Sequence, residues 1–217
     1  MDRGPTAAPR ADEGAGEGIE RLSALSDGVF AIAMTLLVLD VSISPNLDAA
    51  AFERALEDLL PNLAAYALSF VVIAQFWTDH RRILGAAPKA DGPIVALTLL
   101  GLGLIALLPF PTSLLAEYGG ESLAVAIYSG VVGATNAAHL ALTLAVNRRL
   151  RPTADTLARR AQRLDAADLA ATVLVFALAI PLAFVSPDGA KWFWLTLLPI
   201  KVALGRRQHA AQEHLRA

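Results

Sequence analysis

Cysteine is absent from the chain, and charged residues are few. Without cysteine, neither a disulfide framework nor a thiolate metal site can form. Only 18% of the 217 residues are Asp, Glu, Lys or Arg, whereas 55% are hydrophobic, and the mean hydropathy is +0.51. Soluble domains have a lower apolar content and more charge. The composition therefore indicates an integral membrane protein.

The chain also lacks the motifs of several common catalytic sites. No HExxH, GxSxG or GxGD motif occurs, and no glycine-rich phosphate loop. An enzyme embedded in the membrane needs a nucleophile and a base, or a set of metal ligands, within its spans. We therefore expect no enzymatic activity. A TVGYG-like segment is missing too, which excludes a potassium filter built from that type of stacked backbone carbonyls.

Apolar runs long enough to cross a bilayer occupy most of the chain. A helical span needs about 20 mostly apolar residues. Six segments qualify once flanking turns are added to the short second and sixth, and they are residues 22–43, 62–78, 93–115, 122–146, 168–186 and 191–204. Residues 46–63 place Phe52 and several leucines at helical spacing, which predicts a short amphipathic helix that enters the second span through Pro61. The expected fold is an all-α integral membrane protein with six transmembrane helices.

The distribution of basic residues predicts the orientation in the membrane. Sixteen of the 18 Lys and Arg residues lie in the two terminal segments or in the loops after the second and fourth spans. The remaining loops hold only Arg54 and Lys191, so both termini are expected in the cytoplasm. Residues 1–20, rich in Ala, Gly, Pro and Glu, are expected to be a disordered cytoplasmic tail. Residues 21–205 then form the transmembrane domain, and residues 206–217 a cytoplasmic C-terminal tail.

Three stretches, in order along the chain, carry a resemblance to a known family. The first span begins with RLSALSD, which contains Arg21, Ser26 and Asp27; the second contains AYALSFVVIAQFWTDHRR; the third ends in ALLPFPTSLLAEY. Together they resemble the prokaryotic branch of the transmembrane-protein-175 potassium channels, known in animals from endosomes and lysosomes. The family pattern has Phe where this chain has Leu25, and it tends to have a second His where this chain has Arg81.

The resemblance implies a function and an assembly. It implies a passive potassium-selective channel in the bacterial plasma (inner) membrane, built as a homotetramer with the first helix of each subunit lining the pore. Potassium ions and the lipid bilayer are then the partners, with no cofactor and no nucleic acid. By the same resemblance, the hydrophobic constriction falls on Ile32, Leu36 and Leu39.

Helical geometry is consistent with this stripe but does not select it. With ~100° per residue, Leu36 and Leu39 lie at ~40° and ~−20° from Ile32, so the three share one face. An equally apolar stripe contains Phe30, Met34, Leu37 and Val41, and without the resemblance either stripe could be plain packing surface. Thr35, beside the first stripe, either adds a hydroxyl layer to the pore or bonds back to its own helix.

Asp27 is an ionisable residue one turn inside the first span, at ~−140° from Ile32 and hence away from that stripe. A charge inside the membrane needs partners. Arg21, Ser26, Trp77 and His80 are at the same expected depth, so we predict a polar clamp that holds the pore helix against its neighbours. Gly28 is expected to allow close backbone approach.

Other polar residues leave alternatives open. Asp40, at the outer end of the first span, either attracts cations to the pore mouth or is a solvated helix end. Asn136 and His139 either form a proton relay or are satisfied by a neighbouring helix. The second functional hypothesis is a proton-coupled secondary transporter that uses Asp27, Asn136 and His139. Such transporters usually show internal repeats and helices broken in mid-span. This sequence shows no convincing repeat and few helix breakers within its spans, so the transporter is the weaker of the two hypotheses.

Overall fold

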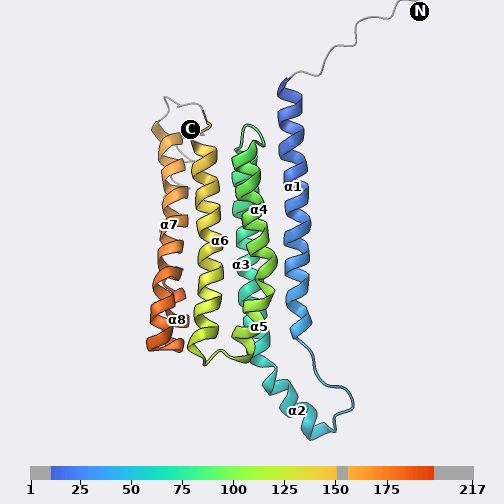
Figure 1. Ribbon diagram of the computed structural model, residues 1–217. Coiled ribbons are helices and arrows are strands. Elements are labelled where there is room, and N and C mark those ends of the chain that lie inside the picture. The colour runs from blue at the N-terminus through green and yellow to red at the C-terminus, as the bar shows by residue number, and fades with distance from the viewer. Residues whose placement is uncertain (1–10, 151–155, 198–217) are drawn as a thin grey trace, which may run out of the picture.

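The computed structural model describes residues 11–150 and 156–197, and over these residues the chain is entirely helical (Figure 1). This confirms the expected fold class. The helices, with η1 a short 3₁₀ turn, are α1 (Ala11–Leu36), η1 (Leu37–Asp40), α2 (Ala49–Asp58), α3 (Leu60–Gly85), α4 (Gly92–Leu107), α5 (Pro109–Glu117), α6 (Ser122–Asn147), α7 (Thr156–Val185) and α8 (Pro187–Trp194).

Within the described residues, five helical stretches are long and apolar enough to cross a membrane. They correspond to the first five predicted spans and are Gly16–Leu39, Ala49–Gly85, Gly92–Glu117, Ser122–Asn147 and Gln162–Val185. Of the predicted sixth span, residues 198–204 lie outside the described residues, as does the expected tail at 206–217.

Helix boundaries follow from local capping chemistry. The Asp48 carboxylate accepts a hydrogen bond from the Ala51 amide at 2.8 Å and starts α2, and Asp91 does the same for α4 through the Ile94 amide at 3.2 Å. The α2 helix confirms the predicted amphipathic segment, since Phe52 and Leu56 lie on it and none of its residues is buried. Figure 1 shows α2 projecting from the bundle.

The first and third predicted spans differ from the observed helices at three places. α1 begins at Ala11, so residues 11–20, expected to be disordered, are helical. α1 also ends early, at Leu36, and tightens into η1. The third span divides into α4 and α5 at Leu108, because Pro109 has no amide hydrogen to continue the helical ladder.

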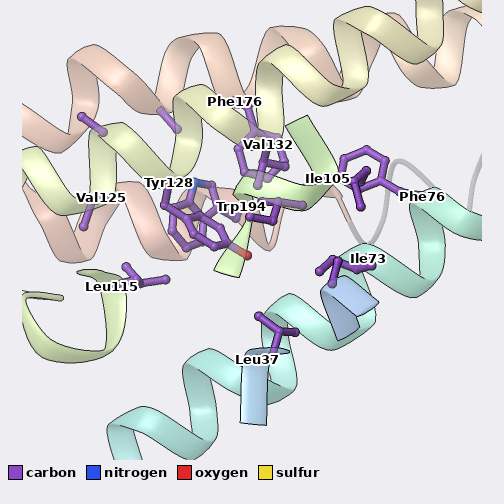
Figure 2. Close-up of a cluster of buried hydrophobic side chains, with 14 of the residues drawn as sticks. Leu37, Ile73, Phe76, Ile105, Leu115, Val125, Tyr128, Val132, Phe176 and Trp194 are labelled. Carbon is purple, nitrogen blue, oxygen red and sulfur yellow. The ribbon is translucent and has the colours of Figure 1, made fainter. Parts of the chain in front are cut away.

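The core of the described chain lies around α6, which packs against α3, α4, α5, α7 and α8. Figure 2 shows its aromatic part, where Tyr128 of α6 lies against Trp194 of α8 with ring centroids 5.2 Å apart. The buried Ser69 hydroxyl lies 3.1 Å from the Tyr128 hydroxyl and accepts a hydrogen bond from Thr112 at 2.8 Å. These contacts link α3, α5 and α6. Because lipid is as apolar as leucine, close packing and polar contacts of this kind hold membrane helices together.

Candidate functional site: the outward face of α1 and its polar clamp

The α1 helix has two faces with opposite surroundings in the subunit. One face is buried and packs on α3 and α4; it carries Leu22, Ser26, Phe30 and Ala33, and continues into η1 with Leu37. On the other face, Ile32, Leu36 and Leu39 keep 60%, 40% and 68% of their surface exposed. Large apolar side chains that are exposed on a membrane helix meet lipid, another subunit or a pore.

This division separates the two stripes that periodicity left equivalent. Phe30 and Leu37, from the alternative stripe, are 0% and 1% exposed and belong to the core of the subunit. Ile32, Leu36 and Leu39 therefore form the stripe that the rest of the described chain leaves uncovered. Figure 1 shows α1 at one edge of the bundle and α7 at the opposite edge.

The structure brings together two pairs of the residues expected in the clamp. Trp77 Nε1 of α3 donates to Asp27 Oδ1 of α1 at 2.7 Å. Ser26 Oγ donates to the Leu22 carbonyl at 2.8 Å, so it accepts from His80 Nε2 at 3.0 Å. His80 therefore carries its proton on Nε2. Both pairs join α1 to α3.

Arg21 and Gly28 do not behave as expected. Arg21 is exposed and forms an ion pair at 3.9 Å with Glu17, one turn earlier on the same helix; among the described residues it makes no contact with Asp27. A Cβ built on Gly28 would meet no atom within 4 Å, so close backbone approach at this position was a wrong prediction for the single subunit. Arg81, in contrast, lies over the Trp77 ring with its Cζ 5.1 Å from the centroid.

Of two further residues predicted at the pore, the structure describes the side chain of Thr35 but not that of Asp40. Thr35 Oγ1 donates to the Ile32 carbonyl at 2.9 Å, so its proton bonds back to its own helix, and its side chain is exposed beside the stripe. Asp40 is the last residue of η1, and its side chain lies outside what the structure describes.

Asn136 and His139 each donate a hydrogen bond within their own helix, whereas a neighbouring helix was one of the two expected alternatives; His139 Nε2 is buried without a hydrogen-bond partner among the described residues. Asn136 Nδ2 donates to the Val132 carbonyl at 3.0 Å, and His139 Nδ1 donates to the Thr135 carbonyl at 2.9 Å. The His139 ring stacks on Phe76 at 5.3 Å and meets the His80 ring edge-on at 5.3 Å. A packed ring thus connects the clamp to α6.

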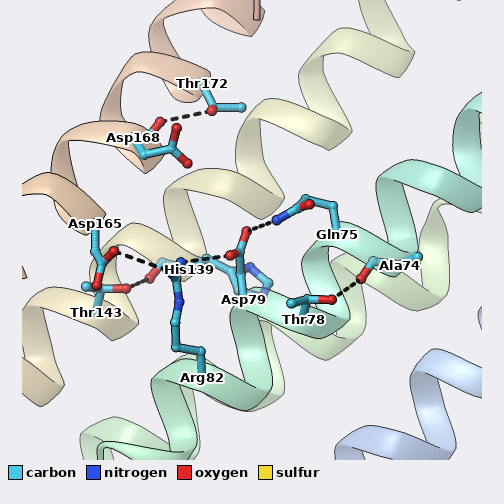
Figure 3. Close-up of polar contacts among 10 residues, drawn as sticks. All are labelled: Ala74, Gln75, Thr78, Asp79, Arg82, His139, Thr143, Asp165, Asp168 and Thr172. Atoms are coloured by element: carbon cyan, nitrogen blue, oxygen red, sulfur yellow. Dashed lines mark hydrogen bonds and ion pairs between the residues drawn. The ribbon is translucent and has the colours of Figure 1, made fainter. Parts of the chain in front are cut away.

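A second polar cluster was missed by sequence reasoning. Asp79 of α3 is buried, accepts from Arg82 at 2.8 Å and from Gln75 at 3.1 Å, and Arg82 also reaches Asp165 of α7 at 3.1 Å (Figure 3). The available signal was Asp79 itself, a carboxylate near the end of an apolar span. The cluster ties α3 to α7 on the side away from α1.

No group of three or more His, Cys, Asp or Glu side chains able to hold a metal ion occurs in the described part of the chain. The charged and polar groups near α1 are instead used in pairs between helices. Over the described residues, the chain is thus an all-helical bundle of membrane-long helices, with an outward apolar stripe on α1 and η1 and polar contacts between α1 and α3 behind it.

Comparisons with known proteins then specify the family. Residues 21–109 match the family described as "Endosomal/lysosomal potassium channel TMEM175". A potassium channel of Streptomyces collinus is 38% identical over 173 residues, which cover 76% of this chain and 82% of that protein. A potassium channel of Chamaesiphon minutus is 33% identical over 150 residues, covering 67% of this chain and 70% of its own. The chain belongs to the TMEM175 family, whose members are channels and not enzymes.

A solved structure supports the same assignment. The crystal structure of a lysosomal potassium-selective channel TMEM175 homolog from Chamaesiphon minutus superposes with a TM-score of 0.72 at 26% identity. The match covers 88% of this chain and 98% of that one. The similarity therefore extends beyond the first three spans, which carry the sequence motifs.

Proposed function

We propose that this chain forms a passive potassium-selective channel, a homotetramer whose pore is lined by the outward face of α1. The observation that carries the proposal is the exposure of Ile32, Leu36 and Leu39 beside a buried opposite face. The names of the bacterial relatives, which are potassium channels, support the choice of ion. The proposal places the protein in the bacterial plasma membrane with both termini in the cytoplasm, as the distribution of Lys and Arg indicates.

Selection at an apolar constriction depends on the cost of removing water from the ion. Side chains of Ile and Leu provide no oxygen that could replace the lost water, so a passing ion keeps its hydration shell or sheds part of it uncompensated. Potassium holds its water less tightly than sodium and sheds it at lower cost. A ring of Ile32, Leu36 and Leu39 side chains would thus favour potassium and close by dewetting, with no resident cofactor.

The polar clamp has a structural role in this proposal. Asp27 and Ser26 face α3, away from the constriction, and their partners Trp77 and His80 fix the rotation of α1 about its axis. A rotation of ~180° would exchange the exposed stripe for the stripe that contains Phe30 and Leu37. The clamp therefore sets which side chains meet the pathway.

Ion flux into liposomes tests the function directly. The purified protein is expected to carry potassium down its gradient, with less sodium, and without dependence on a proton gradient. Flux strictly coupled to protons would instead indicate a secondary transporter and reject the channel.

Substitution at the constriction tests the pathway. Ile32→Asn is expected to retain conduction while the preference for potassium over sodium falls, because an amide ring provides polar groups to both ions. Ile32→Leu, which keeps an apolar ring, is the matched control and should leave selectivity near wild type. A solubilised particle with a mass other than that of four subunits would contradict the tetramer.

A further inference from the structure

Trp77 lies between two opposite charges that come from different elements. Its indole Nε1 donates to Asp27 Oδ1 of α1 at 2.7 Å, while the Arg81 guanidinium of its own helix covers its ring at 5.1 Å from the centroid. We propose that Arg81 is a positioning residue for the pore helix, which acts on Asp27 through Trp77. This inference rests on the proposed function, because the helix that it positions is the one proposed to line the pore.

The arrangement has a direct physical consequence. A cation over the face of an indole is attracted by the electron density of the ring and draws that density toward itself. The N–H at the ring edge then becomes a stronger donor toward the carboxylate that it faces. The guanidinium also restricts the rotation of the ring, which keeps Nε1 aimed at α1. Arg81 thus strengthens a contact between α1 and α3 although, among the described residues, it forms no ion pair with α1 itself.

Arg81 takes the place that Arg21 was expected to fill. Arg21 is on α1 itself but is directed to Glu17, at 3.9 Å, so it does not balance Asp27. Of the cations that the structure describes around this contact, Arg81 is the one stacked on the ring that donates to Asp27.

Arg82 provides a matched control within the same turn. It has the same side chain and an adjacent position, but ~100° of helical rotation directs it elsewhere. Its guanidinium donates to Asp79 at 2.8 Å and to Asp165 at 3.1 Å, so it ties α3 to α7. Loss of Arg82 removes an equal charge from the same end of the subunit without weakening the contact with α1.

The test compares Arg81→Gln, Arg81→Lys, Arg82→Gln and Trp77→Phe by the potassium-to-sodium permeability ratio in liposomes. Arg81→Gln is expected to lower the ratio about two- to fivefold, the effect of losing an exposed cation–π contact. Arg81→Lys, which keeps a cation over the ring, should retain most of the ratio, and Arg82→Gln all of it. Trp77→Phe removes the N–H that connects the cation to Asp27, so adding Arg81→Gln to Trp77→Phe should change nothing further.

Two results would overturn the role of Arg81. One is an unchanged ratio in Arg81→Gln, even with a lowered melting temperature, because Arg81 would then contribute only to stability. The other is a full Arg81→Gln effect in the Trp77→Phe background, because the cation would then act by another route. Failure of the proposed function looks different, since the wild-type protein would carry no potassium flux. In that case the inference is tested by the melting temperatures of the two single variants and the double variant. If the losses from Arg81→Gln and Trp77→Phe add up in the double variant, the inference is overturned.

Discussion

At the level of single residues, the contact between Asp27 and Trp77 is one of two side-chain hydrogen bonds that join α1 to α3 among the described residues. Its 2.7 Å length and ionic acceptor place it among the stronger hydrogen bonds of proteins. Its loss is therefore expected to affect how α1 is held more than the composition of the surface that α1 exposes.

Asp27→Asn is expected to reduce assembly more than selectivity. The amide oxygen can still accept from Trp77, so the cost is the difference between a charged and a neutral acceptor, about 1 kcal/mol. The melting temperature and the yield of assembled particle should both fall, while the potassium-to-sodium ratio of the assembled fraction falls by no more than the two- to fivefold expected for Arg81→Gln, because both variants weaken the same contact. Abolished selectivity in a normally assembled protein would mean that Asp27 acts on the ion, and the clamp would be wrong.

Tyr128→Phe tests the hydroxyl contacts that join α3, α5 and α6. The Tyr128 hydroxyl is buried, and its 3.1 Å contact with Ser69 is lost in the variant. Thr112 still donates to Ser69, so the expected loss of stability is about 1 kcal/mol, measured by thermal unfolding of the solubilised protein. Tyr118→Phe is the control, because Tyr118 is 52% exposed and should change little.

Part of this clamp could be predicted from the sequence, and the wrong partner predicted for Arg21 follows from the disorder predicted for residues 11–20. Depth alone pairs the start of the first span with the end of the second, which brings Asp27 near Trp77 and Ser26 near His80. Arg21 was misplaced because residues 11–20 were expected to be disordered. Once they are helical, Glu17 stands four residues before Arg21 and offers a nearer partner.

At the level of elements, the start of α4 combines a helix cap with an ion pair. The Asp91 carboxylate caps α4 and also receives the Arg149 side chain from the end of α6; the two side chains are 22% and 25% exposed. The hydrogen bond from Arg149 lowers the pKa of Asp91 from its ordinary value of 3.8. Because the folded state favours the ionised form, the stabilisation is present above pH 3.8 and is lost as the pH falls through the lowered pKa.

Asp91→Asn is expected to lower the melting temperature at neutral pH, since Asn caps a helix as well as Asp does but cannot pair with Arg149. The difference from wild type should shrink as the pH is lowered below 3.8, where the wild-type carboxylate is progressively protonated. Asp48→Asn, at a cap without an ion pair, is the control and should show no difference at either pH. A difference for Asp91→Asn that is constant from neutral to acid pH would contradict the argument.

The existence of the elements was easier to predict than their ends. Apolar runs identify five of the helices, because only a helix satisfies its own backbone within a bilayer. The same runs say little about where a helix continues into water, so α3 and α7 extend beyond the predicted limits. The division at Leu108 was not predicted either, although Pro109 and Pro111 were the available signals.

At the level of the whole molecule, sequence patterns could not choose between the two apolar stripes of α1. Both stripes are apolar, so contact with lipid does not favour the exposure of one over the other. Which stripe is buried depends on the packing of Phe30 and Leu37 in the core, and this packing requires α3 and α4 to be in place. Burial within the subunit separates the stripes, whereas assembly decides what the outward one faces.

The absence of cysteine makes that last question directly testable. In the isolated subunit, Ile32 and Leu174 are almost equally exposed, at 60% and 58%, and both lie within membrane spans. A cysteine at the position of Ile32 is expected to react with a water-soluble, charged thiol reagent in the assembled protein, because the pore supplies water, and the modification should reduce potassium flux. A cysteine at the position of Leu174 should face lipid, react slowly and leave the flux unchanged, since a thiolate does not form in hydrocarbon. Equal reactivity at the two positions, or modification of Ile32→Cys without effect on flux, would mean that the outward face of α1 does not line a water-filled pathway.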